Sequence, residues 1–175
     1  MLQGAKVYLR PVRQDDLPGL AAQTNDISVI TEYNFFNLRQ ENEREKRFQE
    51  DGLLSAQYGT LIVVARDGDQ VVGNVSYHPV RYGPNDGSLA YNFGIIILPE
   101  HRGKGYGVEA QRLLAEYLFA VYPVKRVEAS TDITNIPEQR ALEKAGFTRE
   151  GVLRQAQWRN GDWHDMVVYS KLRGE

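Results

Sequence analysis

The chain has 175 residues, of which 42% are hydrophobic and 25% are charged, and this composition is typical of one globular domain over residues 1–175. Its net charge of −2 gives no field that would attract nucleic acid, and its apolar runs are too short to cross a membrane. The absence of cysteine excludes disulfides and thiolate catalysis, and no signal-peptide pattern is visible, so we expect a cytoplasmic protein.

The first third of the chain predicts one strand and two helices. Alternating apolar residues predict a strand over 7–12. Asp15 and Asp16 then predict a helix start, because acidic side chains favour the positive end of a helix. Residues 24–38 are typical of an irregular segment with aromatic residues, and 40–57 predict a highly charged, solvated helix.

The middle of the chain predicts a β-hairpin and a further strand. Two apolar runs, 61–66 and 71–77, flank an Asp67-Gly68 turn, and glycine supplies the positive φ that tight turns require. A polar loop then leads to a strand over 89–97. Beyond Gly107, apolar residues recur with the period of an amphipathic helix.

The last third predicts a strand, a short helix and two final strands, over 126–131, 137–145, 150–159 and 163–172. The final pair flanks Asn160-Gly161, a strong hairpin signal. The complete order is β-α-α-β-β-β-α-β-α-β-β. It predicts an α+β fold with a mixed, mostly antiparallel sheet of about seven strands, flanking helices and one central β-α-β unit.

A basic, glycine-rich turn joins the strand over 89–97 to the following helix. Backbone N–H groups at a helix N-terminus lack partners and favour anions, and glycine lets a phosphate approach them closely. The turn lacks the G-x-x-x-x-G-K-[ST] order, and Val108 breaks the dinucleotide G-x-G-x-x-G pattern. What remains is R-x-x-G-x-G, formed by Arg102, Gly105 and Gly107, which suits a pyrophosphate.

Four separated parts of the sequence resemble the Rim-type (RimJ/RimL-like) branch of the GNAT N-acetyltransferase superfamily. They are Tyr8–Pro11 with Asp15–Leu17, Pro99–Ala110, Asn135 with Glu143–Phe147, and Glu150–Arg154 followed by Gly161–Trp163 and Asp165. The resemblance implies the GNAT fold, with its β-α-β unit binding acetyl-CoA. It also implies direct acetyl transfer to a primary amine, either on a small molecule or at a protein N-terminus.

The resemblance further implies how acetyl-CoA would bind. The backbone of Ile95 and Ile97 would pair with the pantetheine arm, and N–H groups at a bulge near Ile96 and Ile97 would stabilise the oxyanion. The pyrophosphate would be enclosed by Arg102, Gly103, Lys104, Gly105, Tyr106 and Gly107. Asn135 would contact the cofactor arm, although a helix cap with Glu138 as its partner is an equal interpretation.

The chain departs from this resemblance where a proton donor to the thiolate is expected. Many Rim-type relatives have serine where Glu138 stands, and many other GNAT enzymes have tyrosine where Leu142 stands. The candidate catalytic residues are three carboxylates, Glu32, Asp132 and Glu138. Ordinary roles as a solvated loop residue, a turn residue and a helix cap, respectively, are the alternatives. The missing donors also motivate a different function, a catalytically weak or inactive acyl-CoA-binding sensor.

Aromatic residues would line an acceptor cleft if the variable loops and last hairpin converge as in the family. They are Tyr33, Phe35, Tyr91 and Trp158, together with Phe36 and Phe93, and core packing is the alternative for Phe93 and Trp158. The three histidines lack metal-site spacing, so we expect no metal. The expected partners are acetyl-CoA and an amine acceptor, without nucleic acid or membrane. The charged helix and final hairpin offer surfaces for a homodimer.

Overall fold

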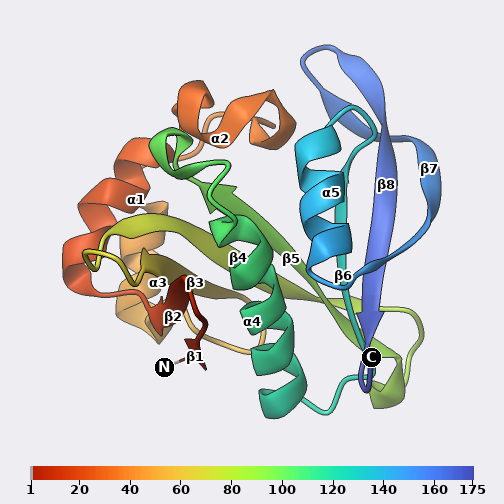
Figure 1. Ribbon diagram of the computed structural model, residues 1–175. Helices are drawn as coiled ribbons and strands as arrows, with labels where there is room; N and C mark the ends of the chain where they lie inside the picture. The colour runs from red at the N-terminus through yellow and green to blue at the C-terminus, as the bar shows by residue number, and fades with distance from the viewer. Residues whose placement is uncertain (1) are drawn as a thin grey trace.

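The computed structural model describes residues 2–175, which form one eight-stranded sheet with helices on both faces (Figure 1). The strands are β1 (Leu2–Gln3), β2 (Val7–Pro11), β3 (Gly59–Ala65), β4 (Val71–Arg81), β5 (Leu89–Ile97), β6 (Arg126–Asp132), β7 (Thr148–Arg159) and β8 (Asp162–Leu172). Their spatial order is β1-β2-β3-β4-β5-β6-β8-β7, and every neighbouring pair is antiparallel except β5–β6. The predicted mostly antiparallel α+β fold is confirmed. The additional strand is the two-residue β1.

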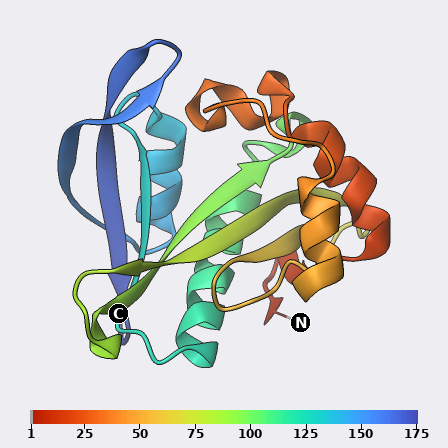
Figure 2. The ribbon, with the colours of Figure 1, turned by 180° about the vertical axis from the view of Figure 1, so that it is seen from behind.

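Helices cover the two faces of the sheet unequally. They are α1 (Leu17–Gln23), α2 (Ile27–Asn34), α3 (Glu43–Asp51), α4 (Tyr106–Val121) and α5 (Ile136–Lys144). Figure 1 shows α4 and α5 on one face, and Figure 2 shows α1 and α3 on the other. Successive strand side chains point to opposite faces. Leu61 and Val63 of β3 therefore join the core cluster that includes α4, whereas Ile62 and Val64 join the cluster beside α1 and α3.

The sheet opens between its two central strands. β5 and β6 pair only at Tyr91–Val127 and Asn92–Glu128. Beyond these pairs β5 remains bonded to β4 and β6 to β8, and Figure 2 shows the two strands diverging. Among the described residues, the end of β5 thus has one edge without a neighbouring strand.

The register of β4 on β5 corrects one expectation. Pairing is continuous from Gly73–Ile97 to Arg81–Leu89, so no register shift marks the bulge expected near Ile96 and Ile97. Gly73 makes the close pairing possible, because a Cβ atom there would lie 2.1 Å from the carbonyl oxygen of Ile96.

Two segments of the N-terminal half differ from the sequence-based predictions. The segment 24–38, expected to be irregular, contains α2, whose first turn is capped by Asp26 and which is interrupted at Thr31 with φ 64°. The charged helix is shorter than predicted, since α3 ends at Gly52 in the left-handed conformation with φ 67°. The cap at Asp26 was the available sequence signal for α2.

No helix among residues 2–175 has the length and apolar character needed to span a membrane.

Candidate active site

The glycine turn places the N-terminus of α4 against the end of β5. Gly105 is the N-cap of α4 with φ 83°, and Gly103 has φ 77°, conformations that favour glycine. Gly107 faces β5, because a Cβ atom there would lie 3.6 Å from Cγ1 of Ile97 and 3.8 Å from Cδ1 of Ile95. The backbone N–H groups of the first turn of α4 therefore lie beside β5, where side chains do not block an anion from approaching them.

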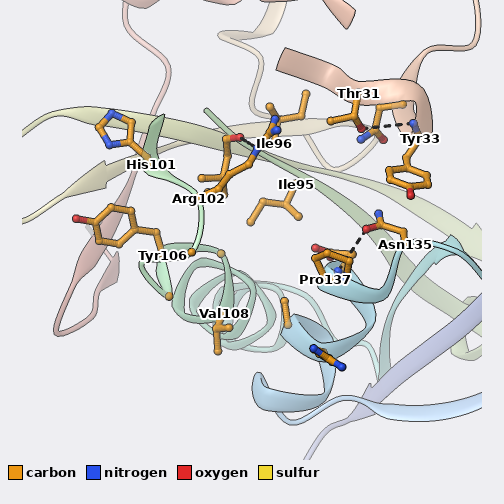
Figure 3. Close-up of a pocket in the computed structure, with 18 of the residues that line it drawn as sticks. Thr31, Tyr33, Ile95, Ile96, His101, Arg102, Tyr106, Val108, Asn135 and Pro137 are labelled. Carbon is orange, nitrogen blue, oxygen red and sulfur yellow. Dashed lines mark hydrogen bonds between the residues drawn. The ribbon is translucent and has the colours of Figure 1, made fainter. Parts of the chain in front are cut away.

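A cavity of about 500 Å³ extends from this turn along β5 (Figure 3). Among the residues predicted to bind cofactor, those lining the cavity are Ile95, Ile97, Arg102, Gly103, Gly105, Tyr106, Gly107 and Asn135. Lys104 does not line it, and the backbone carbonyl of Lys104 accepts a 3.0 Å hydrogen bond from Nζ of Lys6. We name this space the glycine-turn cavity.

The side chain of Arg102 joins β5 to α2. Nε of Arg102 donates a 2.9 Å hydrogen bond to the carbonyl of Ile97, and Nη2 donates a 2.6 Å bond to the carbonyl of Val29. Two of its donors thus hold the cavity wall together, while its charge stays beside the glycine turn.

Two cations of the glycine-turn cavity had not been predicted from the sequence. Arg140 and Lys144 line it from α5, four residues apart on one helix face. Their i, i+4 spacing beside Pro137 and Ala141 was the available signal. The sequence alone does not indicate that this face of α5 lines the same cavity as the start of α4.

A second cavity, of about 530 Å³, lies on the opposite face of the sheet. Its floor is polar, consisting of Thr60, Asn74, Ser76, His78 and Asn92. The pairs Thr60–Ser76 and His78–Asn92 place these side chains on the face that carries α1 and α3. We name this space the polar cavity.

The two cavities meet where β5 leaves β6. They share seven lining residues, Ile30, Tyr33, Asn34, Ile95, Ile96, Asn135 and Glu138. Ile95 and Ile96 are consecutive on a strand and point to opposite faces, so the end of β5 contributes one side chain to each side. A group bound in one cavity can therefore reach a group in the other through this junction.

Glu138 lies at the junction, and no cationic group of residues 2–175 lies within 4.0 Å of its carboxylate. Its carboxylate accepts a 2.6 Å hydrogen bond from Nε2 of Gln111. Burial raises the pKa of Glu138 to about 7, against a smaller lowering effect of the Gln111 bond. A carboxyl group with this pKa exchanges protons readily near neutral pH.

Asn135 is the N-cap of α5. Its Oδ1 accepts a 3.4 Å hydrogen bond from the backbone N–H of Glu138, and its Nδ2 donates a 3.0 Å bond to Oγ1 of Thr131. The capping interpretation therefore holds for Asn135. The carboxylate of Glu138 takes no part in that cap, because it faces Gln111.

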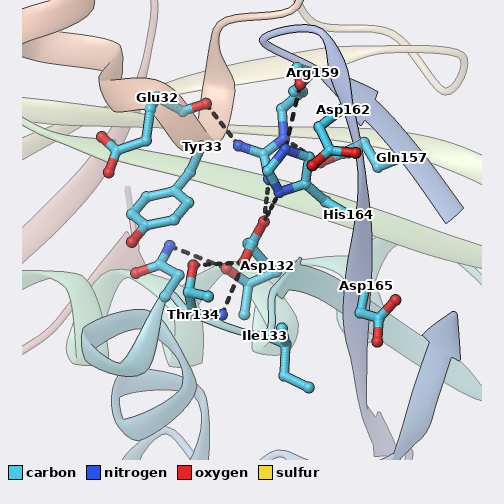
Figure 4. A network of polar contacts seen from close by, with 12 residues as sticks. Glu32, Tyr33, Asp132, Ile133, Thr134, Gln157, Arg159, Asp162, His164 and Asp165 are labelled. Atoms are coloured by element: carbon cyan, nitrogen blue, oxygen red, sulfur yellow. Dashed lines mark hydrogen bonds and ion pairs between the residues drawn. The ribbon is translucent and has the colours of Figure 1, made fainter. Parts of the chain in front are cut away.

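Asp132 lines the polar cavity and lies in a network of polar contacts (Figure 4). Arg159 donates to Asp132, Nδ1 of His164 lies 3.0 Å from its Oδ2, and the backbone N–H and hydroxyl of Thr134 donate to its Oδ1. Burial raises the pKa of Asp132, but the bonds from Thr134 and Arg159 outweigh it and lower the pKa overall. Asp132 is thus an ionised anchor whose oxygens are already engaged.

The same network holds α2 in place. Nη1 of Arg159 donates a 2.6 Å hydrogen bond to the carbonyl of Glu32, which links the final hairpin to α2. The Glu32 side chain is absent from the lining of both cavities. Of the three candidate carboxylates, Glu138 alone lines the junction.

The predicted acceptor aromatics separate into three groups. Tyr33 lines both cavities. Tyr91 is 1% exposed and belongs to the core, because it follows the opposite face of β5 from its neighbour Asn92. Trp158 is 55% exposed on the final hairpin, and neither Trp158 nor Phe35 lines the glycine-turn cavity or the polar cavity. We therefore reassign Tyr91 to the core.

Comparison of the chain with known protein families agrees with these features of the site. The family model described as an acetyltransferase (GNAT) domain matches residues 6–148. The chain belongs to this family and is an N-acetyltransferase.

Individual relatives cover nearly the whole chain. The probable N-acetyltransferase YjcK of Bacillus subtilis (strain 168) is 31% identical over 179 residues, covering 98% of this chain and 97% of that protein. A spermidine N-acetyltransferase from Vibrio cholerae, solved with CoA and spermine, has a TM-score of 0.82 at 22% identity and 97% coverage of both chains. RimL, a ribosomal L7/L12 alpha-N-protein acetyltransferase solved with CoA, has a TM-score of 0.79 at 18% identity, covering 97% of this chain and 95% of its own. At these identities the two structures establish the GNAT fold, and the RimL neighbour agrees with the Rim-type resemblance at that level.

Proposed function

We propose that the chain transfers the acetyl group of acetyl-CoA directly to the primary amine of an acceptor. The observation that carries this proposal is the meeting of two cavities on opposite faces of the sheet at one set of shared residues, with Glu138 among them. Two substrates entering from the two faces would react at that junction without a covalent intermediate on the enzyme.

The glycine-turn cavity has the features that coenzyme A requires. The N-terminus of α4, with Gly105 and Gly107, offers backbone donors to the pyrophosphate. Arg140 and Lys144 would supply positive charge for the third phosphate of coenzyme A, which is attached to the ribose. The edge of β5 beyond Asn92 is free to pair with the amide-bearing pantetheine arm.

The chemistry needs one bond to form and one to break. The amine nitrogen attacks the thioester carbonyl carbon, the carbon–sulfur bond breaks, and the proton lost from nitrogen balances the proton gained by the CoA thiolate. At pH 7 an α-amine with a pKa near 7.8 is about 14% unprotonated, whereas a lysine amine near 10.4 is about 0.04% unprotonated. An α-amine therefore needs little help from a base before it attacks.

We assign the proton transfer to Glu138. With a pKa of about 7, its carboxylic acid form can donate to the departing thiolate, and the resulting carboxylate can receive the proton of the amine. It stands at the position where many Rim-type relatives carry serine, so the change is from a hydroxyl donor to a carboxyl donor.

Binding and turnover test the proposal together. Acetyl-CoA should raise the melting temperature of the protein, and adding amines or N-terminal peptides should release free thiol. Stabilisation without thiol release or acetylated product from any acceptor would favour the acyl-CoA sensor. No stabilisation at all would reject the cofactor site.

A further inference from the structure

We infer that the natural acceptor carries a carboxylate in addition to the amine that receives the acetyl group. This inference rests on the proposed function and concerns the polar cavity, where Arg39 and Arg44 line the wall. A free amino acid and a peptide with an acidic residue near its N-terminus both offer this chemistry.

The charge of the polar cavity is positive away from the junction. Its lining contains two carboxylates, Asp132 and Glu138. Asp132 is already engaged by Arg159 and His164. Glu138 lies at the junction, so neither carboxylate neutralises the arginine wall.

Arg44 is partly buried without a carboxylate partner. Its Nη1 donates a 3.0 Å hydrogen bond to the carbonyl of Leu20, and no carboxylate of residues 2–175 lies within 4.0 Å of its guanidinium nitrogens. Burial is the largest influence on its pKa and lowers it overall. The charges of Arg39 and Arg47 lower the pKa further, and Tyr58 and Glu43 raise it. A desolvated guanidinium without an ion-pair partner, with the charge of Arg39 nearby, favours an anionic ligand, which it binds with charge-assisted hydrogen bonds.

The floor of the same cavity holds a second, independent sign. Asn74 is 4% exposed, and its Nδ2 has no hydrogen-bond partner in the described part of the chain. A buried donor without a partner is costly, and an acceptor oxygen of a ligand would satisfy it. A polyamine has donors and positive charge alone, so it would leave Asn74 unsatisfied and be repelled by Arg39 and Arg44.

The test compares matched acceptors with the purified full chain and acetyl-CoA. One pair is L-leucine and L-leucinamide. The other is two tripeptide amides that both begin with alanine and differ only in having glutamate or glutamine as the second residue. Spermidine serves as the polycationic acceptor. Because the α-amine of leucine is more basic than that of leucinamide, kcat/KM is expressed per unprotonated amine. We expect this value for one carboxylate-bearing member to exceed that of its uncharged partner and of spermidine by about tenfold or more. The pair that shows the preference identifies the source of the carboxylate.

Variants then assign the preference to the arginines. Arg44→Gln and Arg39→Gln should each reduce kcat/KM for the carboxylate-bearing acceptor by about tenfold and change that of its uncharged partner less than about twofold. Arg39 is exposed, so its variant tests the inference even if Arg44→Gln fails to fold. The control is Arg81→Gln, on β4 and outside both cavities, which should leave both constants unchanged.

Failure of the inference can be distinguished from failure of the proposed function. If the wild type prefers the uncharged acceptors or spermidine, the transferase stands and the inference is overturned. If no amine is acetylated, calorimetry with CoA and N-acetyl-leucine or the N-acetylated glutamyl peptide decides. Binding that Arg44→Gln or Arg39→Gln weakens supports the inference, and undetectable binding overturns it.

Discussion

Gln111 donates a 2.6 Å hydrogen bond from Nε2 to the carboxylate of Glu138, linking the central helix α4 to α5 at the junction of the two cavities. Gln111 is fully buried and neutral. The carboxyl group is therefore fixed in position by a neutral partner, and no cation in the described part of the chain pairs with it. Burial dominates, and the pKa rises to about 7.

Replacing Glu138 by glutamine should slow chemistry while preserving the fold. Glutamine can still accept from Gln111 and still leaves the backbone cap by Asn135 intact, but it cannot exchange a proton. We expect kcat to fall by about a hundredfold with little change in KM for acetyl-CoA. Steady-state kinetics of thiol release measure both constants.

The matched control is Glu143→Gln, on the same helix but outside both cavities, where the carboxylate accepts from the hydroxyl of Tyr169. It should keep kcat within about twofold of wild type. Equal kcat values for Glu138→Gln and wild type would remove Glu138 from the mechanism.

The raised pKa of Glu138 also predicts how stability depends on pH. The folded-state pKa of about 7 exceeds the ordinary value of 4.5, so the folded protein binds the proton more tightly. Its contribution to stability is present below pH 4.5 and is lost as pH rises through 7. The unfolding free energy of wild type minus that of Glu138→Gln should fall by on the order of 1–3 kcal/mol between about pH 5 and 8. Urea unfolding at several pH values measures it, and a flat difference would contradict the assignment.

The glycine turn should be sensitive to substitution in a way that separates binding from strain. Gly105→Val places a β-branched side chain at φ 83°, next to the proposed phosphate site. Gly161→Val is the control, because Gly161 has φ 80°, lies in the distant final hairpin, and would place a Cβ atom more than 4 Å from any neighbouring group. Each variant should lose roughly 1–3 kcal/mol of stability. Only Gly105→Val should weaken acetyl-CoA binding by about tenfold or more in calorimetry, and similar affinities for both variants would reject the site.

Local signals predicted most of the fold. The Asn160-Gly161 turn occurs with φ of 50° and 80°, and it joins β7 to β8 as expected. The helix α2 was missed because it has only eight residues and is interrupted at Thr31, so its apolar residues span too few turns to establish a helical period. The charged helix was predicted to be too long, because the sequence pattern did not reveal that Gly52 ends it in the left-handed conformation.

Some residues of the candidate site were predicted correctly from the sequence, and others were not. The glycine turn follows from local backbone chemistry, so most of its residues line one cavity as expected. Tyr91 depended on which face of β5 points to the core, and a shift of one residue exchanges the faces. Arg159, which determines the surroundings of Asp132, lies 27 residues away in sequence and had no local signal.

Substitutions in the buried pair of Asp132 and Arg159 should reduce the stability of the protein more than they affect the chemical step. Asp132→Asn leaves the buried Arg159 without its anionic partner, which costs about 3–5 kcal/mol. Arg159→Met should cost less, because Asp132 keeps its contacts with Thr134 and His164. The double variant should lose less than the sum of the two single losses, and a double-mutant cycle from urea unfolding measures the difference. Wild-type stability with a large loss of kcat in Asp132→Asn would instead identify Asp132 as the base.

The most direct measurement is a single turnover starting from the protein loaded with acetyl-CoA and mixed with an acceptor amine. Free thiol and N-acetylated acceptor should appear at the same rate, and mass spectrometry should find no acetylated protein at any time. Glu138→Gln should slow both signals equally. Thiol release ahead of the N-acetylated product, with acetyl groups accumulating on the protein, would contradict direct transfer at the junction.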